Sequence, residues 1–384
     1  MATDQAATPD KPAELPPLRS VHSSNFPAIL DELGISLLVS TYQAGKLVLL
    51  RADNGVLNTH FRGFNRPMGL AVSGDRLAIG TGLEIWEYHN LPAVAARLEP
   101  AGRHDGCFMP RSGHVTGDVQ IHEMAWSGKR DEGLGTRGEG AGDTQELWFV
   151  NTRFSCLCTL DSVHSFVPRW RPPFITALAP EDRCHLNGLA MVRGVPAFVT
   201  ALGETDTKGG WRENKKDGGV LIEVVTGKTL VRGLSMPHSP RWHNGRLWLL
   251  ESGTGGLGYV DPTTDRYEKV VEMPGFTRGL DFCGPLAFVG LSQVRESAVF
   301  SGIPITEQNR PRRSGVWIVN METGKTIAFV EFEEALQEIF AVQVLHGMRF
   351  PDLINDNPRV LADSFVLPTE SLNTVAEPFR FPAR

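Results

Sequence analysis

The hydrophobic pattern of this chain repeats along its length. A polar residue leads into a short apolar strand, a turn containing glycine follows, and a second apolar strand ends in small polar residues. The pattern is clear at residues 183–200, where the run Cys-His-Leu-Asn-Gly-Leu-Ala precedes the run Val-Pro-Ala-Phe-Val-Thr. Four other copies and a weaker sixth have the same form: 66–80, 122–151, 238–251, 278–290 and 340–344. Repetition at about 40–65 residues is typical of blade-type arrays.

The repeat predicts both the fold and its closure. Short strands that alternate or are wholly apolar, separated by Gly, Pro, Asn and Asp, suit four-stranded blades around a channel. The sixth copy has one strand, and three unassigned strands precede the first copy, at 35–42, 46–52 and 56–64. We therefore predict an all-β, six-bladed β-propeller whose last blade is closed by N-terminal strands, which removes an open sheet edge. A seven-bladed propeller and a β-sandwich are the alternatives.

The 384 residues are predicted to form one domain, because each blade of a closed ring needs its neighbours. Residues 1–24 are rich in Pro, Ala, Thr and charge, which predicts a disordered tail. Residues 25–355 form the propeller in this prediction, and residues 356–384 form an extended C-terminal tail.

Two local signals lie outside the repeat. A polar residue before the apolar run at 26–33 predicts a short helix that ends at Gly34. The stretch 128–143 is rich in glycine and charge, which predicts a mobile loop in the second blade.

Composition describes an ordinary globular protein and excludes few functions. The net charge of −6 argues against a nucleic-acid partner or an anionic membrane. No apolar run approaches the ~20 residues that span a bilayer, and no secretory signal is recognised at the N-terminus. Five cysteines, an odd number without such a signal, predict reduced thiols and a cytoplasmic location.

Polar residues at the strand ends form the candidate site. In a propeller, the first strand of every blade lines the channel, and its start lies at the same rim as the end of the second strand. The two ends of each repeat should therefore converge, on a rim where loops carry function. They supply histidines, carboxylates, amides and arginines: Arg66, His122, Glu123, Asn151, Arg153, His185, Asn187, His238, Glu251 and Arg278.

One chemistry that suits this set is a metal site. His122, His185 and His238 stand at matching repeat positions beside Glu123 and Glu251, and could together hold a divalent metal. Imidazole with carboxylate suits zinc, iron or manganese.

A second chemistry needs no metal. Arg66, Arg153 and Arg278 could bind a carboxylate or phosphate by bidentate hydrogen bonds, with Asn151 and Asn187 as further substrate contacts. A histidine would then be the general base. Each residue also has a structural interpretation, in which a histidine bonds neighbouring backbone and an arginine pairs with a carboxylate.

We predict an enzyme that acts on a small anionic molecule at the rim by hydrolysis or lyase chemistry, with or without a metal. Its catalytic candidates are His122, Glu123, His185, His238 and Glu251. The alternative is a non-catalytic propeller that binds a ligand or a protein through its rim loops. The expected partner is thus a small molecule or a protein, and neither nucleic acid nor a membrane.

Several runs are longer than propeller periodicity demands. They are Ser-Thr-Tyr-Gln-Ala-Gly-Lys-Leu at 40–47, Asn-Thr-Arg-Phe-Ser-Cys-Leu at 151–157, Trp-Arg-Pro-Pro-Phe at 170–174, Cys-His-Leu-Asn-Gly-Leu at 184–189 and Pro-His-Ser-Pro-Arg-Trp at 237–242. Together they resemble an uncharacterised bacterial family of conserved hypothetical proteins, sometimes fused or adjacent to tetratricopeptide-repeat proteins. The resemblance covers residues 25–355 and implies no activity.

A weaker similarity is to the six-bladed gluconolactonase and paraoxonase propellers, in which an Asn-Gly-Leu strand start supplies a calcium ligand. Asn187-Gly188-Leu189 is similar, and by this resemblance implies calcium. That group has acidic ligands at neighbouring strand starts, whereas this chain has His122, His238 and Arg278. Fold analogy alone does not give function.

Overall fold

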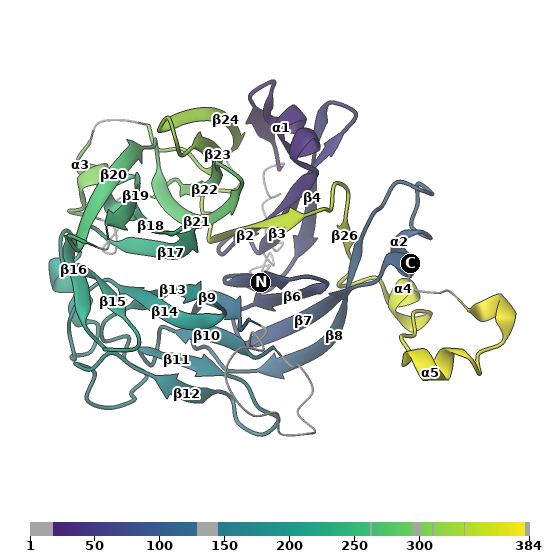
Figure 1. Ribbon diagram of the computed structural model, residues 1–384, viewed down its shortest axis with the longest axis horizontal. Helices are drawn as coiled ribbons and strands as arrows, with labels where there is room; N and C mark the ends of the chain where they lie inside the picture. Colours follow the sequence, from purple (N-terminus) through teal and green to yellow (C-terminus); the bar gives the residue numbers. More distant parts are fainter. Residues whose placement is uncertain are drawn as a thin grey trace, which may run out of the picture.

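The computed structural model describes residues 18–128, 145–261, 263–294, 301–308, 311–333 and 335–380. Its strands form six small sheets around one axis, a six-bladed β-propeller (Figure 1). The predicted fold class is confirmed, and neither seven blades nor a sandwich is formed. All but the first residue of the predicted loop at 128–143 lies outside the described residues.

Each blade begins with an innermost strand and runs outward through antiparallel pairs, except that β26 (Asp352–Leu353) pairs in parallel with β8 (Cys107–Val115). Blade 1 consists of β5 (Leu70–Ser73), β6 (Arg76–Gly80), β7 (Glu84–Asn90), β8 (Cys107–Val115) and the outer β26 (Asp352–Leu353). Blade 2 consists of β9 (Ile121–Trp126), β10 (Leu147–Asn151), β11 (Cys156–Thr159) and β12 (Val167–Trp170). Blade 3 consists of β13 (Leu186–Val192), β14 (Val195–Ala201), β15 (Gly219–Glu223) and β16 (Thr229–Leu234).

The other three blades follow the same plan. Blade 4 consists of β17 (Pro237–His243), β18 (Arg246–Glu251), β19 (Gly256–Asp261) and β20 (Arg266–Glu272). Blade 5 consists of β21 (Phe276–Cys283), β22 (Leu286–Ser292), β23 (Gly315–Asn320), β24 (Lys325–Phe332) and the outer β1 (Ser20–His22). Blade 6 consists of β25 (Ala341–His346), β2 (Ile35–Thr41), β3 (Lys46–Asp53) and β4 (Val56–Gly63).

Blade 6 joins the two ends of the propeller, as the strand pattern predicts. Its innermost strand β25 comes from the C-terminal part of the chain. It pairs antiparallel with β2 from Ile35 to Ser40. The predicted helix α1 (Phe26–Leu33) is also confirmed, and it ends at Gly34, whose φ of 65° favours glycine. Phe26 and Leu30 of α1 are fully buried in the apolar core between blades 5 and 6.

The two tails differ from the sequence-based prediction. Residues 1–17 lie outside the described residues, but Ser20–His22 forms β1, which pairs with the edge of β24 through backbone hydrogen bonds. The C-terminal stretch is not simply extended, since it contains α4 (Pro358–Ala362), α5 (Thr369–Leu372) and the 3-10 helix η3 (Glu377–Phe379). Asn357 caps α4 by accepting from the backbone N–H of Val360 at 3.2 Å.

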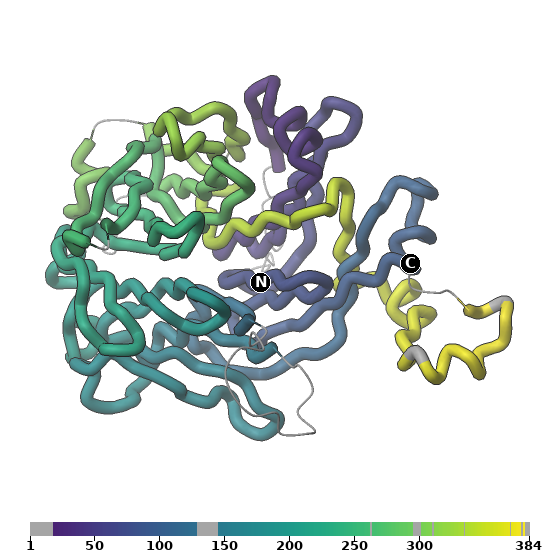
Figure 2. Tube along the Cα trace, viewed as in Figure 1, coloured from purple at the N-terminus to yellow at the C-terminus, as the bar shows by residue number. Residues whose placement is uncertain are grey.

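The C-terminal helices lie on the outside of blade 1. α4 packs beside α2 (Pro92–Ala95) in a small apolar cluster, whereas α5 stands away from the ring (Figures 1 and 2). The five cysteines are free thiols. No helix in the described part of the chain is both long and apolar enough to cross a membrane.

Candidate functional site

The starts of the innermost strands meet at one rim, which we call the channel mouth. In four blades the first residue of the innermost strand pairs with the last residue of the second strand: Ile121 with Asn151, Leu186 with Ala201, Pro237 with Glu251, and Phe276 with Ser292. The next residues therefore occupy equivalent places, and these are His122, Asn187, His238 and Thr277.

This register corrects one premise of the sequence analysis. His185 does not match His122 and His238, because it lies two residues before the place that these two share, and Asn187 takes that place. His185 instead matches Gln120, and both have a left-handed backbone with φ of 50° and 55°. Met236, which precedes β17, has the same left-handed backbone, with φ of 48°.

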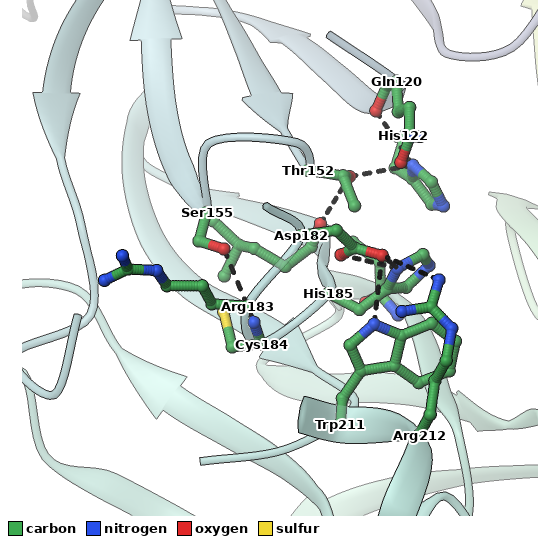
Figure 3. A network of polar contacts seen from close by, with 12 residues as sticks. Gln120, His122, Thr152, Ser155, Asp182, Arg183, Cys184, His185, Trp211 and Arg212 are labelled. Atoms are coloured by element: carbon green, nitrogen blue, oxygen red, sulfur yellow. Dashed lines mark hydrogen bonds and ion pairs between the residues drawn. The ribbon is translucent and has the colours of Figure 1, made fainter. Parts of the chain in front are cut away.

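His122 links blade 2 to blade 3. Its Nδ1 donates to the backbone oxygen of Gln120 at 3.0 Å and lies 2.8 Å from Thr152 Oγ1, whose hydroxyl donates to the backbone oxygen of Leu186 at 2.6 Å (Figure 3). Because a carbonyl oxygen only accepts, Nδ1 of His122 must carry the ring proton, and Nε2 has a lone pair.

His238 repeats this arrangement between blades 4 and 5. Its Nδ1 lies 2.9 Å from the backbone oxygen of Met236 and 2.9 Å from Ser252 Oγ. The Ser252 hydroxyl in turn donates to the backbone oxygen of Thr277 at 2.5 Å. His238 therefore has the same tautomer as His122, with its lone pair on Nε2.

Asn187 makes the corresponding link between blades 3 and 4 without a histidine. Its amide nitrogen donates to the backbone oxygen of Pro237 at 3.0 Å, and its oxygen accepts from Thr200 Oγ1 at 2.7 Å. The oxygen that the gluconolactonase resemblance implies as a calcium ligand is thus engaged by Thr200. The next residue, Gly188, allows the close approach, since an added Cβ would lie 2.3 Å from Pro240 Cδ.

Serine side chains continue the same pattern around the ring. Ser292 Oγ donates to the backbone oxygen of Ile339 at 3.0 Å, and Ser40 Oγ donates to that of Met68 at 2.5 Å. Side chains therefore link each blade to the next from blade 2 around to blade 1. Several of the polar side chains that the sequence analysis proposed as a functional site therefore also hold the blades together.

Replacing Ser252 with alanine tests this structural role. The change leaves the Thr277 carbonyl without its donor, and an unpaired buried polar group costs about 1–3 kcal/mol, so we expect an equal fall in the free energy of unfolding. Urea denaturation measures it. The exposed Ser112 on β8 supplies the control, because Ser112→Ala should change stability by less than about 0.5 kcal/mol. Equal stability of the two variants would contradict the assignment.

His185 has a carboxylate partner instead of a backbone one. Its Nδ1 lies 2.9 and 3.0 Å from the two oxygens of Asp182 (Figure 3). Trp211 Nε1 donates to the same carboxylate at 3.0 Å, and Arg212 lies 3.5 Å from it. The carboxylate places the ring proton on Nδ1 and leaves the Nε2 lone pair, which is the arrangement of an oriented general base.

Local structure explains how these groups meet. Asp182 and His185 both have left-handed backbones, with φ of 49° and 50°, and the turn between them brings carboxylate and imidazole together. Trp211 comes from the 3-10 helix η1 (Gly210–Asn214) in the loop after β14, and its indole lies 4.5 Å from the imidazole between ring centroids. The sequence analysis missed Asp182 and Trp211, although an acidic residue three positions before His185 was a usable signal.

Arg278 supplies the positive charge of the inner mouth. Its guanidinium lies 3.5 Å above the ring centroid of Phe340 and 3.5 Å from Glu338. Burial lowers the pKa of Arg278 to about 10, so that it stays charged at neutral pH. Burial, and then the charge of Arg278, lower the pKa of His122 and of His238 well below the usual range. Both imidazoles are therefore neutral.

Ring contacts join His122, His185, Phe340 and Tyr42 in one group. The His122 ring lies 4.7 Å from that of His185 and 5.1 Å from that of Phe340, between centroids. Tyr42 follows at 6.0 Å from Phe340.

An open cavity of about 410 Å³ lies beside the His185–Asp182 pair. It is lined by Gln120, Arg153, Pro180, Glu181, Asp182, Lys208, Gly209 and Arg212. Both of its carboxylates have an arginine partner: Glu181 lies 2.8 Å from Arg183, and Asp182 lies 3.5 Å from Arg212. Lys208 has no such partner among the described carboxylates, so the cavity favours an anionic ligand.

The predicted arginines lie at different depths. Arg66 and Arg153 both approach Asp118, at 3.6 and 3.9 Å, and Arg153 also lines the cavity. Arg278 lies deeper, with its guanidinium on Phe340.

The other predicted site residues are engaged elsewhere. Glu123 is buried and pairs with Arg241 at 2.8 Å. Glu251 accepts from the backbone N–H of Ser235 at 3.3 Å and from Thr254 Oγ1 at 2.8 Å. Asn151 accepts from the backbone N–H of Phe154. The mouth therefore brings together the three histidines, Arg153 and Arg278, whereas Glu123, Glu251 and Asn151 have internal partners.

The predicted metal centre stays a prediction. Within the described ranges, no three side chains of His, Cys, Asp or Glu lie close enough to hold a metal ion together. The lone pairs on Nε2 of His122, His185 and His238 favour a metal, and the charge of Arg278 beside two of these rings opposes one.

The fold and the mouth define a six-bladed propeller with a polar, histidine- and arginine-lined channel opening. The chain belongs to the family described as "Domain of unknown function (DUF4915)", whose model matches residues 24–354. This confirms membership of an uncharacterised family, while the tetratricopeptide link and the gluconolactonase similarity stay predictions. No curated protein matches the chain.

Two solved structures are similar to this chain. One is the crystal structure of a nidogen/laminin complex, at 9% identity and a TM-score of 0.47, covering 82% of this chain and 99% of that one. The other is a protein of unknown function from Bacteroides caccae, at 10% identity and a TM-score of 0.48, covering 81% of this chain and 98% of that one.

Proposed function

We propose that this protein is an enzyme that binds a small anionic molecule at the channel mouth and catalyses a hydrolase or lyase reaction. The observation that supports this best is the His185–Asp182 pair at the edge of an open cavity that three cations line.

In this proposal His185 is the general base. Its Nε2 removes a proton from a substrate carbon or hydroxyl, or from an attacking water, and Asp182 stabilises the imidazolium that forms. Trp211 holds the carboxylate through its indole N–H. Arg153 and Lys208 bind the anionic group, Arg153 by the bidentate geometry that guanidinium offers to carboxylate and phosphate. Glu123 and Glu251 keep no catalytic part, because their carboxylates are engaged elsewhere.

A non-catalytic propeller is the second candidate. It is favoured by the links that His122, Asn187 and His238 make between blades, because these explain much of the polar ring without chemistry. Its ligand or protein partner would bind at the rim loops.

Turnover of small anionic esters, lactones, phosphoesters and hydroxy acids by the purified protein tests the proposal. For any substrate found, we expect His185→Ala to lower kcat/KM by about 10²–10⁴-fold, the usual contribution of a positioned base. Asp182→Asn should lower kcat/KM less, because the base remains and only the anion that stabilises its imidazolium is lost.

The chain offers a matched control for both variants. Asp161 and His164 form an exposed pair with the same spacing, with Nδ1 2.7 Å from the carboxylate. Asp161→Asn and His164→Ala should leave kcat/KM unchanged. If the variants at His185 and Asp182 behave like these controls, or if no anion is bound or turned over, the non-catalytic candidate stands instead.

A further inference from the structure

The three histidines at the mouth share one hydrogen-bonding state. In each ring Nδ1 faces an oxygen that only accepts, which is the backbone oxygen of Gln120 for His122, that of Met236 for His238, and Asp182 for His185. Each neutral ring therefore carries its proton on Nδ1 and presents Nε2 as a hydrogen-bond acceptor.

These acceptors have no hydrogen-bond partner within the described part of the chain, where His122 and His185 are half-buried and His238 is 4% exposed. No described residue bonds to Nε2 of His122, His185 or His238, and none of the three atoms is among the described buried atoms that are sealed without a partner.

Asn187 shows that linking the blades does not require a histidine. It occupies the place equivalent to His122 and His238, and its amide nitrogen serves the neighbouring blade directly. An asparagine amide reaches about as far as Nδ1 of an imidazole, so what His122 and His238 add to this role is Nε2. The repeats with His122 and His238 thus carry an Nε2 acceptor that the repeat with Asn187 lacks.

The charge around the acceptors defines the rest of the ligand. Arg153, Lys208 and Arg212 line the cavity beside Asp182, and the charge of Arg278 lowers the pKa of both His122 and His238. The arginine and lysine side chains suit an anionic group of the ligand, and the Nε2 lone pairs of the histidines suit hydroxyl groups that donate hydrogen bonds. An anion without hydroxyls would leave the lone pairs unpaired.

We infer that the ligand of this mouth is a small hydroxy acid, whose anionic group meets Arg153 and Lys208 and whose hydroxyls donate to Nε2 of His122 and His238. The inference rests on the proposed function, since it names the substrate class of the same site.

Calorimetric titration with matched pairs of anions tests it. Tartrate against succinate compares carboxylates with and without hydroxyls, and glycerol phosphate against propyl phosphate does the same for a phosphate. We expect the hydroxylated member of at least one pair to bind tighter by about tenfold for each hydroxyl bonded to an imidazole. The pair that shows this preference identifies the anionic group.

His238→Asn isolates the acceptor from the link between blades. The asparagine keeps a donor for the Met236 carbonyl and removes Nε2, so the variant should keep its melting temperature within a few degrees and lose the preference for hydroxylated anions. His238→Gln removes the Nδ1 donor instead and should be the less stable variant. A preference that survives in His238→Asn overturns the inference.

The remaining outcomes separate this inference from the proposed function. Equal binding of both members of each pair, with turnover that still depends on His185, overturns the inference alone. No binding of any anion overturns both. Stoichiometric zinc, iron or manganese in the purified wild type, lost in His238→Asn, also overturns the inference, because the lone pairs would then be metal ligands.

Discussion

Replacing Arg241 with methionine is expected to lower the free energy of unfolding by about 3–5 kcal/mol, the cost of breaking a buried ion pair from one side. Arg241 on β17 reaches across the channel to Glu123 on β9, with its guanidinium 2.8 Å from the carboxylate. Burial raises the pKa of Glu123, and Arg241 opposes that rise. Without Arg241 the carboxylate is left buried and unpaired.

The double variant Glu123→Leu/Arg241→Met should recover most of this loss, because neither charge then remains to be buried. Urea denaturation at neutral pH measures both variants. The penalty of the single variant should shrink as pH falls, since the folded state then binds a proton at Glu123 before the unfolded state does. Arg232→Met, which breaks an exposed pair with Glu204, is the control and should cost about 0–1 kcal/mol. Equal losses in the single and double variants would assign the effect to packing instead.

Replacing Phe350 with alanine should cost a similar 3–5 kcal/mol, for a different reason. The ring of Phe350 is nearly buried, and the guanidinium groups of Arg51 and Arg103 lie over it at 4.0 and 4.2 Å from its centroid. Arg51 belongs to blade 6, and Arg103 to the loop that precedes β8 of blade 1. Truncating Phe350 removes buried apolar area and two cation–π contacts at the boundary between these blades.

The measurement is the melting temperature together with urea denaturation. Phe365→Ala is the control, since that side chain is 82% exposed in the stretch after α4 and should contribute less than about 0.5 kcal/mol. A Phe350→Ala variant as stable as the control would show that blades 1 and 6 are held together by other contacts.

Residues 349–355, which we call the clasp, hold this boundary from outside the ring. β26 pairs in parallel with β8, and Arg51 donates to the backbone oxygen of Pro351 at 2.7 Å. Asp352 accepts from Arg62 of β4 at 2.9 Å. Burial acts to raise the pKa of Asp352. The hydrogen bond with His60 and the charge of Arg62 nevertheless hold this pKa well below its usual range. The last blade is thus fastened twice, by β25 on the inside and by the clasp on the outside.

The sequence predicted the ring because the ring depends on strand spacing. Apolar runs at regular separation predict six blades. The single strand left over near the C-terminus and the three left over near the N-terminus predict that the last blade combines both. β1 and β26 were missed because strands of three and two residues pair through backbone atoms and leave no hydrophobic pattern. The helix at 26–33 was found because Gly34 marks its end.

The site was predicted by residue type but not by partner. His122, His185 and His238 do meet at the mouth, but Glu123 finds its partner 118 positions away in Arg241, a distance that no local pattern reveals. Repeat alignment equated His185 with the wrong position, because a pattern of polar and apolar letters does not determine the strand register to a single residue.

Blade 6 also sets the order in which the molecule can be completed during synthesis. All seven residues of β2 are buried, yet the inner neighbour of β2 is β25, which begins only at Ala341. While the ribosome makes the five blades between them, β2 has an unpaired edge facing the channel, and an edge of this kind invites pairing with other chains. The ring is therefore sealed only after β25 has been made, and until then β2 is exposed to misassembly.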